Sequence, residues 1–372
     1  MFKHGECRLI KRLIPQGSLV YKLIIIILLS VPFNTLADTV NTDDELSTAL
    51  EKIRIKNDIP SMSVAIITSG EITYIKGFGF LDKKQEKATN EESLFRIASI
   101  TKLFTAQAIM QLVEKNKIEL NEKVGRYLSS FKESSITIKQ LLTHSSGISD
   151  TIKPVGFEKQ RTVGSYLGLV KQSLPENNEG KDFEYSDTNF NVLGAIISSV
   201  SGDSYEKYIY NNILKPSNMK ESGYFDSESA YFSETEPTYK GKLLDKADRR
   251  PYDLSFNPSE GLISNVHDLS RWLTLTLAGD SSLLNAQTYK DMLKPQVKTS
   301  WGELYMGLGW QVYNHSNDII ARHPGSIRGY KSLVLTYPDS KNALIILTNS
   351  SNTPRWEIAK LITNILKQNA EW

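Results

Sequence analysis

The chain has very few of the residues from which metal sites and disulfides are built. Its 372 residues include one cysteine and five histidines, and no histidine lies in a His-Glu-x-x-His motif. A single cysteine excludes a thiolate metal cluster, and the missing zinc motif leaves no candidate set of ligands. We therefore expect no metal site.

The chain also has almost no excess of charge of either sign. It carries 44 basic and 42 acidic residues, for a formal net charge of +2. The first 37 residues contribute five basic residues and one acidic residue, which leaves 39 basic and 41 acidic residues in the rest. A polyanion-binding surface is not supported, so we expect no nucleic-acid partner.

Long hydrophobic runs are scarce, and the clearest one lies near the N-terminus. Residues 23–31 are apolar, follow a basic segment, and precede Thr35-Leu36-Ala37. This order of segments predicts a signal peptide over residues 1–37, cleaved after Ala37. The apolar stretch is short for a membrane span. The protein is therefore expected to be exported, periplasmic or secreted, with an uncleaved anchor at residues 23–36 as the alternative.

The remaining sequence alternates between strand-like and helical patterns. Strands are predicted at 62–68, 72–77, 309–313, 332–337 and 343–348, and helices at 43–55, 101–115, 138–142, 163–172, 190–200, 205–213, 267–277 and 353–366. We expect an α/β (α+β) fold, in which one discontinuous sheet domain (38–98 and 300–372) carries a mainly helical insertion (99–299). Residues 227–250 are polar and weakly patterned, which indicates a long surface loop.

A serine and a lysine lie three residues apart at the start of an apolar helical pattern. Ser99 and Lys102 precede apolar residues that recur at helical spacing to residue 113. Because residues i and i+3 share a helix face, the lysine ammonium can lie beside the serine hydroxyl and activate it as a nucleophile. The same Ser-x-x-Lys spacing also begins at Ser129, Ser204 and Ser217. Only Ser99 has a setting that favours catalysis.

Two further segments could complete a catalytic site. Tyr185 stands just before a predicted helix, where its phenol could reach a cleft and act as a general base near a lysine. His323, Gly325 and Ser326 lie in a glycine-containing segment before a predicted strand. A strand edge of this kind lets backbone N–H groups face a substrate carbonyl. Alone, the first could be a packing tyrosine and the second an ordinary tight turn.

Together these motifs resemble the serine hydrolase family that joins class C β-lactamases, DD-peptidases and related esterases and D-aminopeptidases. Ser99-x-x-Lys102 matches its first motif, Tyr185-Ser186-Asp187 its Tyr-x-Asn element, and His323-Pro324-Gly325 its Lys/His-x-Gly element. The resemblance extends from about residue 57 to residue 366. Collateral segments at 141–148, 261–264, 306–310 and 345–349 occur in the family's order. The expected architecture is therefore β-lactamase/transpeptidase-like, an antiparallel sheet flanked by helices, with the active site between sheet and helical insertion.

His144, beside Ser145 and Ser146, suggests a different catalytic pair. The chain lacks the Gly-x-Ser-x-Gly elbow of the α/β-hydrolases, which weakens that interpretation. The resemblance places this segment among structural elements, so we expect a structural His144.

The resemblance implies that Ser99 attacks an acyl carbonyl while Lys102 and Tyr185 handle its proton, and the sequence leaves open which of them is the base. The oxyanion would bind the backbone N–H groups of Ser99 and Ser326. No metal or organic cofactor is implied. Asp187, His323, Gly325 and Ser326 are the expected substrate-binding and oxyanion residues.

Two departures from the family pattern bear on the substrate. Asp187 stands where the family usually carries Asn, and an ionised carboxylate cannot donate to a substrate amide and repels a substrate carboxylate. His323 stands where class C β-lactamases usually carry Lys. Both changes argue against an efficient β-lactamase.

The sequence therefore predicts an exported serine hydrolase for peptide, amide or ester acyl groups, of DD-peptidase, D-aminopeptidase or esterase type. The substrate would be a small molecule or peptide, for which a cell-wall peptide or a β-lactam is a candidate. The alternatives are a weak class C-like β-lactamase, a penicillin- or peptide-binding sensor that acylates without turnover, and an inactive scaffold. The sequence does not indicate the natural substrate, its stereochemistry or the oligomeric state.

Overall fold

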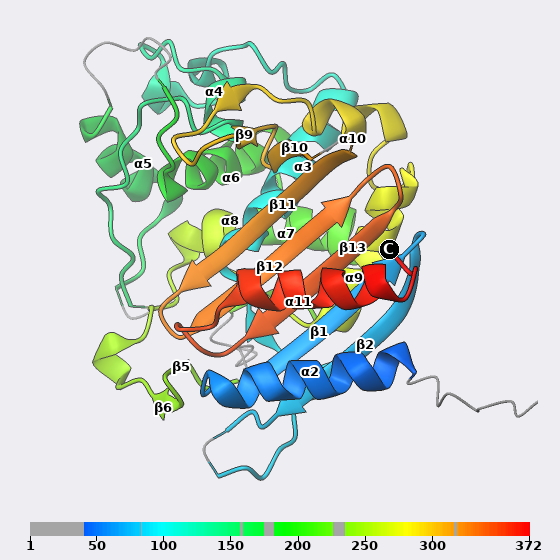
Figure 1. Ribbon diagram of the computed structural model, residues 1–372. Coiled ribbons are helices and arrows are strands. Elements are labelled where there is room, and N and C mark those ends of the chain that lie inside the picture. Colours follow the sequence, from blue (N-terminus) through cyan, green and yellow to red (C-terminus); the bar gives the residue numbers. More distant parts are fainter. Residues whose placement is uncertain (1–40, 83, 157–158, 175–181, 226–234, 316–317) are drawn as a thin grey trace, which may run out of the picture. The chain divides into compact units, whose positions relative to one another are not determined.

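An eight-stranded antiparallel sheet brings the two ends of the folded chain together (Figure 1). A computed structural model describes residues 41–82, 84–156, 159–174, 182–225, 235–315 and 318–372. The strand order is β2-β1-β13-β12-β11-β10-β9-β8. The strands are β1 (Ser61–Thr68), β2 (Glu71–Gly79), β8 (Val297–Lys298), β9 (Tyr305–Met306), β10 (Gln311–His315), β11 (Asp318–Ile327), β12 (Tyr330–Tyr337) and β13 (Asn342–Thr348). Because β1 pairs directly with β13, strands from the two chain ends share the sheet, as the sequence predicts.

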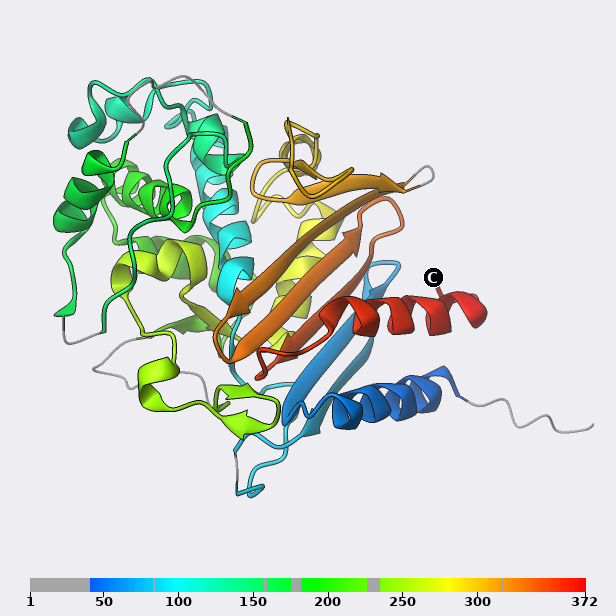
Figure 2. The same cartoon turned by 60° about the vertical axis from the view of Figure 1, so that its left-hand side comes forward.

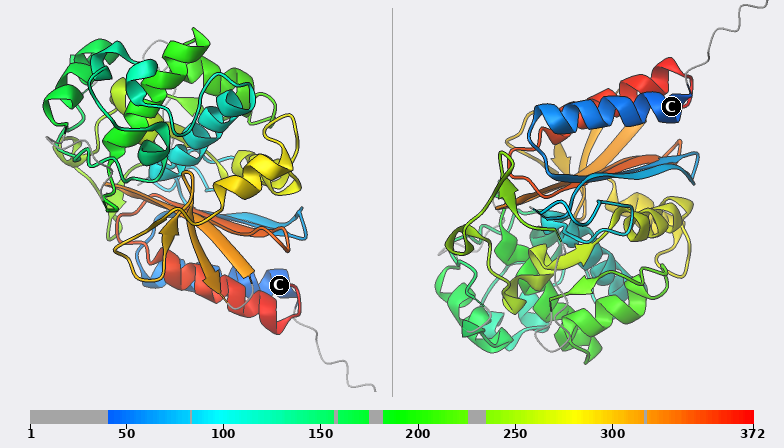
Figure 3. Two further views of the ribbon diagram at one scale, coloured as in Figure 1. Left: turned by 90° about the horizontal axis from the view of Figure 1, so that it is seen from above. Right: turned by 90° about the horizontal axis from the view of Figure 1, so that it is seen from below.

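Two terminal helices cover one face of this sheet. Helices α2 (Thr42–Lys56) and α11 (Arg355–Gln368) lie together on that face (Figures 1 and 3). Leu46 and Leu50 of α2 and Ile358 and Ile362 of α11 are buried in one apolar cluster with strand residues such as Val64. The amphipathic pattern of each helix therefore leads to burial of one apolar stripe against the sheet.

The other face of the sheet is covered by the long segment between β2 and β10 (Figures 2 and 3). Its helices are α3 (Thr101–Glu114), α4 (Ile138–Leu142), α5 (Val163–Gln172), α6 (Asp187–Ser201), α7 (Tyr205–Ile209), α8 (Asn257–Glu260), α9 (Val266–Ala278) and α10 (Ala286–Met292). Helix α3 is buried along nearly its whole length, and Phe104 stacks on Trp272 of α9 at 4.5 Å between ring centroids. The larger apolar core therefore lies between the helices and the sheet.

A second, three-stranded sheet positions the start of α3. Strand β7 (Leu262–Ser264) pairs with β3 (Phe95–Arg96) and with β4 (Gly223–Tyr224). Because β7 directly follows α8, this pairing brings α8 next to the 3₁₀ turn Ala98–Ile100. A separate two-stranded ribbon joins β5 (Thr238–Tyr239) to β6 (Lys242–Leu243) within the predicted surface loop.

The predicted fold class is confirmed, whereas the division at residues 98–99 and 299–300 stays a prediction. The predicted signal segment 1–37, including its alternative as an anchor at 23–36, lies outside the described residues. Among the helices that the structure describes, none has the length and apolar character required to cross a membrane.

Strand β11 differs from the sequence interpretation, which placed the segment around Pro324 before a strand or in a tight turn. The structure includes this proline within β11 and places the turn after Ile327. A proline cannot donate to a neighbouring strand, so it is confined to strand edges. Strand β10 pairs with β11 only as far as Arg322. From His323 onward none of the described strands pairs with that edge of β11, so Pro324 interrupts no ladder between the described strands there.

Candidate active site

Ser99 lies in a short 3₁₀ turn between β3 and α3. The sequence placed it at the helix N-terminus, but α3 begins only at Thr101 and Ser99 belongs to the preceding turn. The residue before it, Ala98, has a φ of +51°, in the left-handed region that residues with a side chain rarely adopt. Such backbone persists where the surrounding structure enforces it. The partly exposed Ser99 is thus set by tertiary packing as well as by the helix.

Lys102 is fully buried and hydrogen-bonded to three different groups. Its Nζ lies 3.3 Å from Ser99 Oγ, 2.6 Å from Asp187 Oδ1 and 3.0 Å from the main-chain oxygen of Ser259. Burial favours the neutral amine, but Asp187 and, next to it, Tyr185 together outweigh this effect and raise the pKa of Lys102 above its ordinary value. Lys102 is therefore an ammonium at neutral pH.

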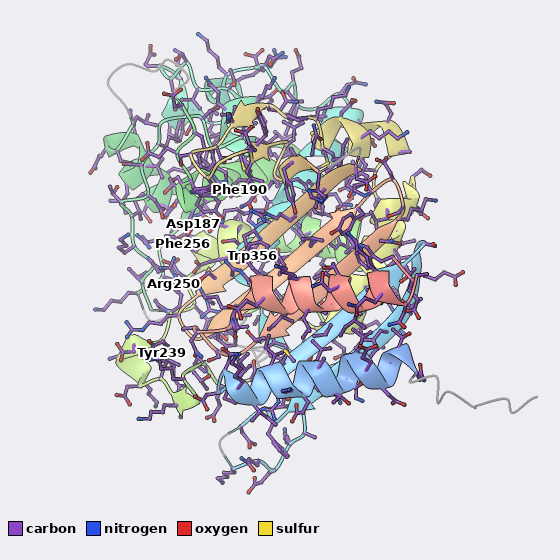
Figure 4. The ribbon with its side chains drawn as sticks, viewed as in Figure 1. Asp187, Phe190, Tyr239, Arg250, Phe256 and Trp356 are labelled. Carbon is purple, nitrogen blue, oxygen red and sulfur yellow. The ribbon has the colours of Figure 1, made fainter. Side chains whose placement is uncertain are left out.

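Asp187 is the first residue of α6 and connects Lys102 to a second cation. A carboxylate in the first turn of a helix is favoured by the helix dipole. Its Oδ2 lies 3.8 Å from Nη2 of Arg250, which in turn contacts Glu260 at 2.8 and 2.9 Å. Figure 4 labels Asp187 and Arg250 on the side of the molecule where β11 ends.

Tyr185 completes the group around Ser99. The Lys102 ammonium lies 5.1 Å from the centroid of its ring, and Trp301 packs against the ring at 5.8 Å. Burial raises the pKa of Tyr185, and the Lys102 charge and hydrogen bonding to Ser99 lower it without cancelling that effect. The resting site thus pairs a phenol with an ammonium.

His144 is a supporting residue of this site. Its ring stacks on Tyr185 at 4.3 Å, and its Nδ1 accepts the backbone N–H of Ser186 at 3.2 Å. Burial, followed by the charge of Lys102, holds its pKa well below the usual value. The hydroxyl of Ser145 bonds instead with Thr143 at 2.9 Å. These contacts are those of a neutral histidine that holds Tyr185 and the start of α6 in place.

His323 is buried on β11, with its ring 6.5 Å from that of Tyr185. Its Nδ1 lies 3.0 Å from the main-chain oxygen of Pro324. Burial, followed by the Lys102 charge, lowers the pKa of His323 to about 3. A neutral imidazole cannot supply the positive charge that a lysine would carry at this position, which supports the distinction drawn from the sequence.

Gly325 allows β11 to pass directly against the segment that leads into Ser99. A Cβ added to Gly325 would lie 2.0 Å from Ser332 Oγ and 2.3 Å from the main-chain oxygen of Ile97. Arg355 donates to the main-chain oxygen of Gly325, and Lys331 donates to the hydroxyl of Ser326. These contacts hold the unpaired edge of β11 beside the serine.

An open cleft of about 540 Å³ lies beside Asp187, and Ser99 itself is not among the residues that line it. Its lining includes Asp187, Arg250 and Glu260 and, from β11 and β12, Ser326 and Lys331. The volume is sufficient for a small-molecule or peptide fragment. Within the part of the chain that the structure describes, no three His, Cys, Asp or Glu side chains lie together where they could hold a metal ion.

The structure brings Ser99, Lys102, Tyr185 and Asp187 together, places His323 beside Tyr185, and sets Gly325 against the chain before Ser99. Ser326 lines the same cleft as Asp187. Sequence reasoning missed Arg250, Glu260 and the carbonyl of Ser259, which belong to no recognisable motif. Their roles follow only from tertiary contacts.

Comparison with known proteins agrees with this geometry. A family model described as Beta-lactamase matches residues 43–366. Protein flp from Staphylococcus aureus is 27% identical over 326 residues, which cover 84% of this chain, and the chain spans 64% of that relative's length.

Solved structures share the fold. The octameric penicillin-binding protein homologue from Pyrococcus abyssi has a TM-score of 0.75 at 28% identity, covering 88% of this chain and 77% of its own. D-amino acid amidase from Ochrobactrum anthropi has a TM-score of 0.74 at 21% identity, covering 88% and 99%. At that identity the amidase supports the fold alone. With a family model matching most of its length, this chain belongs to the beta-lactamase family of serine hydrolases, as its motifs predicted.

Proposed function

We propose that the protein is an exported serine hydrolase that forms an acyl-enzyme on Ser99. One observation supports this most strongly: a fully buried lysine contacts both a partly exposed serine hydroxyl and a carboxylate. A buried charge is costly, so its retention beside a nucleophile points to catalysis. Export rests on the predicted signal segment 1–37, and the mass of the chain from a cell fraction would test its removal.

In the proposed reaction, Ser99 Oγ forms a bond to the acyl carbonyl carbon while the carbonyl π electrons move onto oxygen. The backbone N–H groups of Ser99 and Ser326 would bind that oxyanion, and losing one such donor typically costs about 3–4 kcal/mol. The Ser99 proton moves to the Tyr185 oxygen while the phenol's own proton passes to the leaving group, whose bond to carbon breaks. Lys102 stays an ammonium throughout. Water then attacks the acyl-enzyme and releases Ser99.

Lys102 would act in this scheme as a permanent cation. Because Asp187 raises its pKa, the ammonium is available to stabilise negative charge on Ser99 Oγ and to polarise the Tyr185 phenol. We therefore assign the proton shuttle to Tyr185 and the electrostatic role to Lys102.

The charges of the site favour peptide, amide or ester acyl groups without a carboxylate beside the scissile bond. Asp187 would repel such a carboxylate, and neutral His323 adds no positive charge of its own. Arg250 and Lys331 of the cleft are cations that could offset this repulsion. Within the predicted DD-peptidase-, D-aminopeptidase- and esterase-like range, this condition favours the aminopeptidase and esterase types, because a DD-peptidase that releases a C-terminal residue cleaves beside a carboxylate. A cell-wall peptide remains the leading natural substrate because of the proposed export. The D-amino acid amidase is consistent with this range through its shared fold.

The test is intact-mass spectrometry of the purified chain incubated with a fluorescent penicillin, with Ser99→Ala as the control. A stoichiometric adduct that is absent from the variant would support Ser99 as the nucleophile. If no adduct forms, a panel of p-nitrophenyl esters and D-amino-acid anilides follows. If the protein forms no adduct with penicillin and hydrolyses neither the esters nor the anilides, the proposal is contradicted.

The second candidate is a weak β-lactamase or a sensor that acylates without turnover. The observation that keeps it open is the name of the Pyrococcus abyssi neighbour, a penicillin-binding protein homologue. The decay of the penicillin adduct separates these functions. Rapid decay with continuing turnover indicates a β-lactamase, and a stable adduct after a single burst indicates a sensor.

A further inference from the structure

Arg250 stands between two carboxylates of the site. Its Nε and Nη2 contact Glu260 at 2.8 and 2.9 Å, and the same Nη2 lies 3.8 Å from Asp187 Oδ2. Its guanidinium also lies 5.5 Å from the ring centroid of Phe256. Only 4% of the Glu260 side chain is exposed, so the anchor of the guanidinium is almost fully inside the protein.

The bidentate contact with Glu260 fixes the guanidinium in one orientation. A planar guanidinium that pairs with a carboxylate through two parallel hydrogen bonds loses its freedom to rotate. Asp187 therefore faces a stationary cation with one oxygen, while its other oxygen accepts from Lys102 at 2.6 Å. With one cation beside each of its two oxygens, the Asp187 carboxylate is held in a single orientation.

The four groups also balance in charge. Lys102 and Arg250 carry two positive charges, and Asp187 and Glu260 carry two negative charges. The Lys102 ammonium also donates to the main-chain oxygen of Ser259, the residue before Glu260. Without Arg250, Glu260 would be a buried carboxylate with no cation held against it, and Lys102 would be the nearest remaining cation of the cluster.

We propose that Arg250, anchored by Glu260, is a positioning residue that acts through Asp187 and thereby keeps Lys102 in contact with Ser99. The contact that depends on it is the long one, 3.3 Å from Lys102 Nζ to Ser99 Oγ. A small rotation of Asp187 would draw the ammonium away from the serine. The inference rests on the proposed acylation of Ser99.

The test is a double-mutant cycle on the rate of Ser99 acylation, measured with a p-nitrophenyl ester or fluorescent penicillin that acylates the wild-type protein. Arg250→Gln should slow acylation about tenfold or more in the wild-type background. In an Asp187→Asn background the same change should cost less than about twofold, because the residue through which Arg250 acts has gone. An equal loss in both backgrounds would overturn the proposal.

A second pair of variants separates positioning from simple neutralisation of Glu260. Arg250→Gln alone should lower the Tm, since it leaves Glu260 unpaired. Adding Glu260→Gln removes that buried charge and should restore much of the Tm, while acylation stays slow. Recovery of the acylation rate in this double variant would mean that Arg250 only neutralises Glu260, and the proposal would fail.

Arg249→Gln is the matched control for loss of positive charge from the same loop. The Arg249 side chain donates to the main-chain oxygen of Leu244 and makes no ion pair within 4 Å among the described residues. Its effect on acylation should be the same in the wild-type and Asp187→Asn backgrounds. If Ser99 is acylated in the wild-type protein and at the same rate in Arg250→Gln, this inference fails but the proposed function stands. A wild-type protein that no acyl donor labels overturns the proposed function as well.

Discussion

The carboxylate of Asp187 lies 2.6 Å from the ammonium of Lys102, whose side chain has no exposed surface. Removing one partner of a buried ion pair typically destabilises a protein by about 3–5 kcal/mol, because the remaining charge is left without compensation. The family usually carries a neutral Asn at this position. In this protein the ammonium form of the lysine beside the nucleophile is therefore supported by the carboxylate of Asp187, with Tyr185 as the second contributor.

The first prediction is that Asp187→Asn lowers the pKa of Lys102. Burial, which lowers this pKa, would then act without the carboxylate that raises it. In the wild-type protein the folded pKa lies above the reference value of 10.5, so the ion pair stabilises the fold below that pH and is lost as pH rises through the folded pKa. The variant should have a lower Tm at pH 7, and the gap should narrow at strongly alkaline pH.

The same variant distinguishes the two candidate bases. If Lys102 must be an ammonium, the rate of Ser99 acylation in the Asp187→Asn variant should fall at an alkaline pH at which the wild-type protein is still active. A variant that instead gains activity as pH rises would make neutral Lys102 the base and contradict the assignment to Tyr185. The rate on β-lactams relative to that on a neutral ester should increase, since the repulsion of a substrate carboxylate is gone. A decrease in this ratio would mean that the charge of Asp187 does not disfavour β-lactams.

The second prediction concerns the Tyr185 hydroxyl. Tyr185→Phe should slow acylation by roughly 10²–10⁴-fold, the usual contribution of general acid–base catalysis. The ring would still stack on His144, so Tm should change little. Tyr208→Phe is the matched control, because its hydroxyl is also buried and has no hydrogen-bond partner among the described residues. Equal rates for the two variants would exclude Tyr185 from proton transfer.

Sequence reasoning predicted which residues lie together in the candidate site wherever contiguous residues carry the signal. Ser99 and Lys102 stand at the start of one periodic pattern, and Tyr185 and Asp187 at the start of another, so short sequence spacing predicts that each pair lies close together. Arg250 has no such pattern, because it lies at the end of a polar loop and its role depends on where α6 and α8 fold. No local feature of the sequence carries that information.

The strands, too, were predicted where the local sequence carries the signal and missed where tertiary contacts decide. Those with uninterrupted apolar or alternating patterns were predicted to within a few residues, and β1 and β13 are examples. Strand β11 was not, because Pro324 opposes a strand unless its edge lacks a neighbour. Whether that edge is open depends on the length of β10, which is a tertiary property. Motif order sufficed to predict the fold class, but it could not give the pairing that exposes β11 to the cleft.

The third prediction is a loss of stability in acid that depends on His323. Its folded pKa of about 3 lies below the reference value of 6.5, so the unfolded chain binds a proton that the folded protein does not. Stability should therefore fall as pH drops below about 6.5 and should level off near pH 3. This difference between the folded and unfolded pKa values corresponds to about 5 kcal/mol in the free energy of unfolding.

His323→Gln removes the titrating group while it keeps a side-chain donor for the main-chain oxygen of Pro324. Denaturant unfolding of the two proteins should then diverge between pH 6.5 and pH 4, with the variant losing less stability on acidification. Carboxylates and His144 contribute to both curves, so the difference between the curves isolates His323. Parallel curves would mean that the pKa of this imidazole is the same in the folded protein as in the unfolded chain.

The last prediction concerns the contact between β11 and the segment before Ser99. A Cβ at Gly325 would lie 2.3 Å from the main-chain oxygen of Ile97, and a backbone atom cannot move aside as a flexible side chain can. Gly325→Ala should displace β11 from the nucleophile, lower the Tm, and slow acylation more than substrate binding. Gly168→Ala, at an exposed site in α5 with no atom near its added Cβ, should leave the acylation rate unchanged and raise the Tm slightly, because Ala favours a helix. If Gly325→Ala lowers the Tm but acylates Ser99 at the wild-type rate, the oxyanion role inferred for this edge of β11 is wrong.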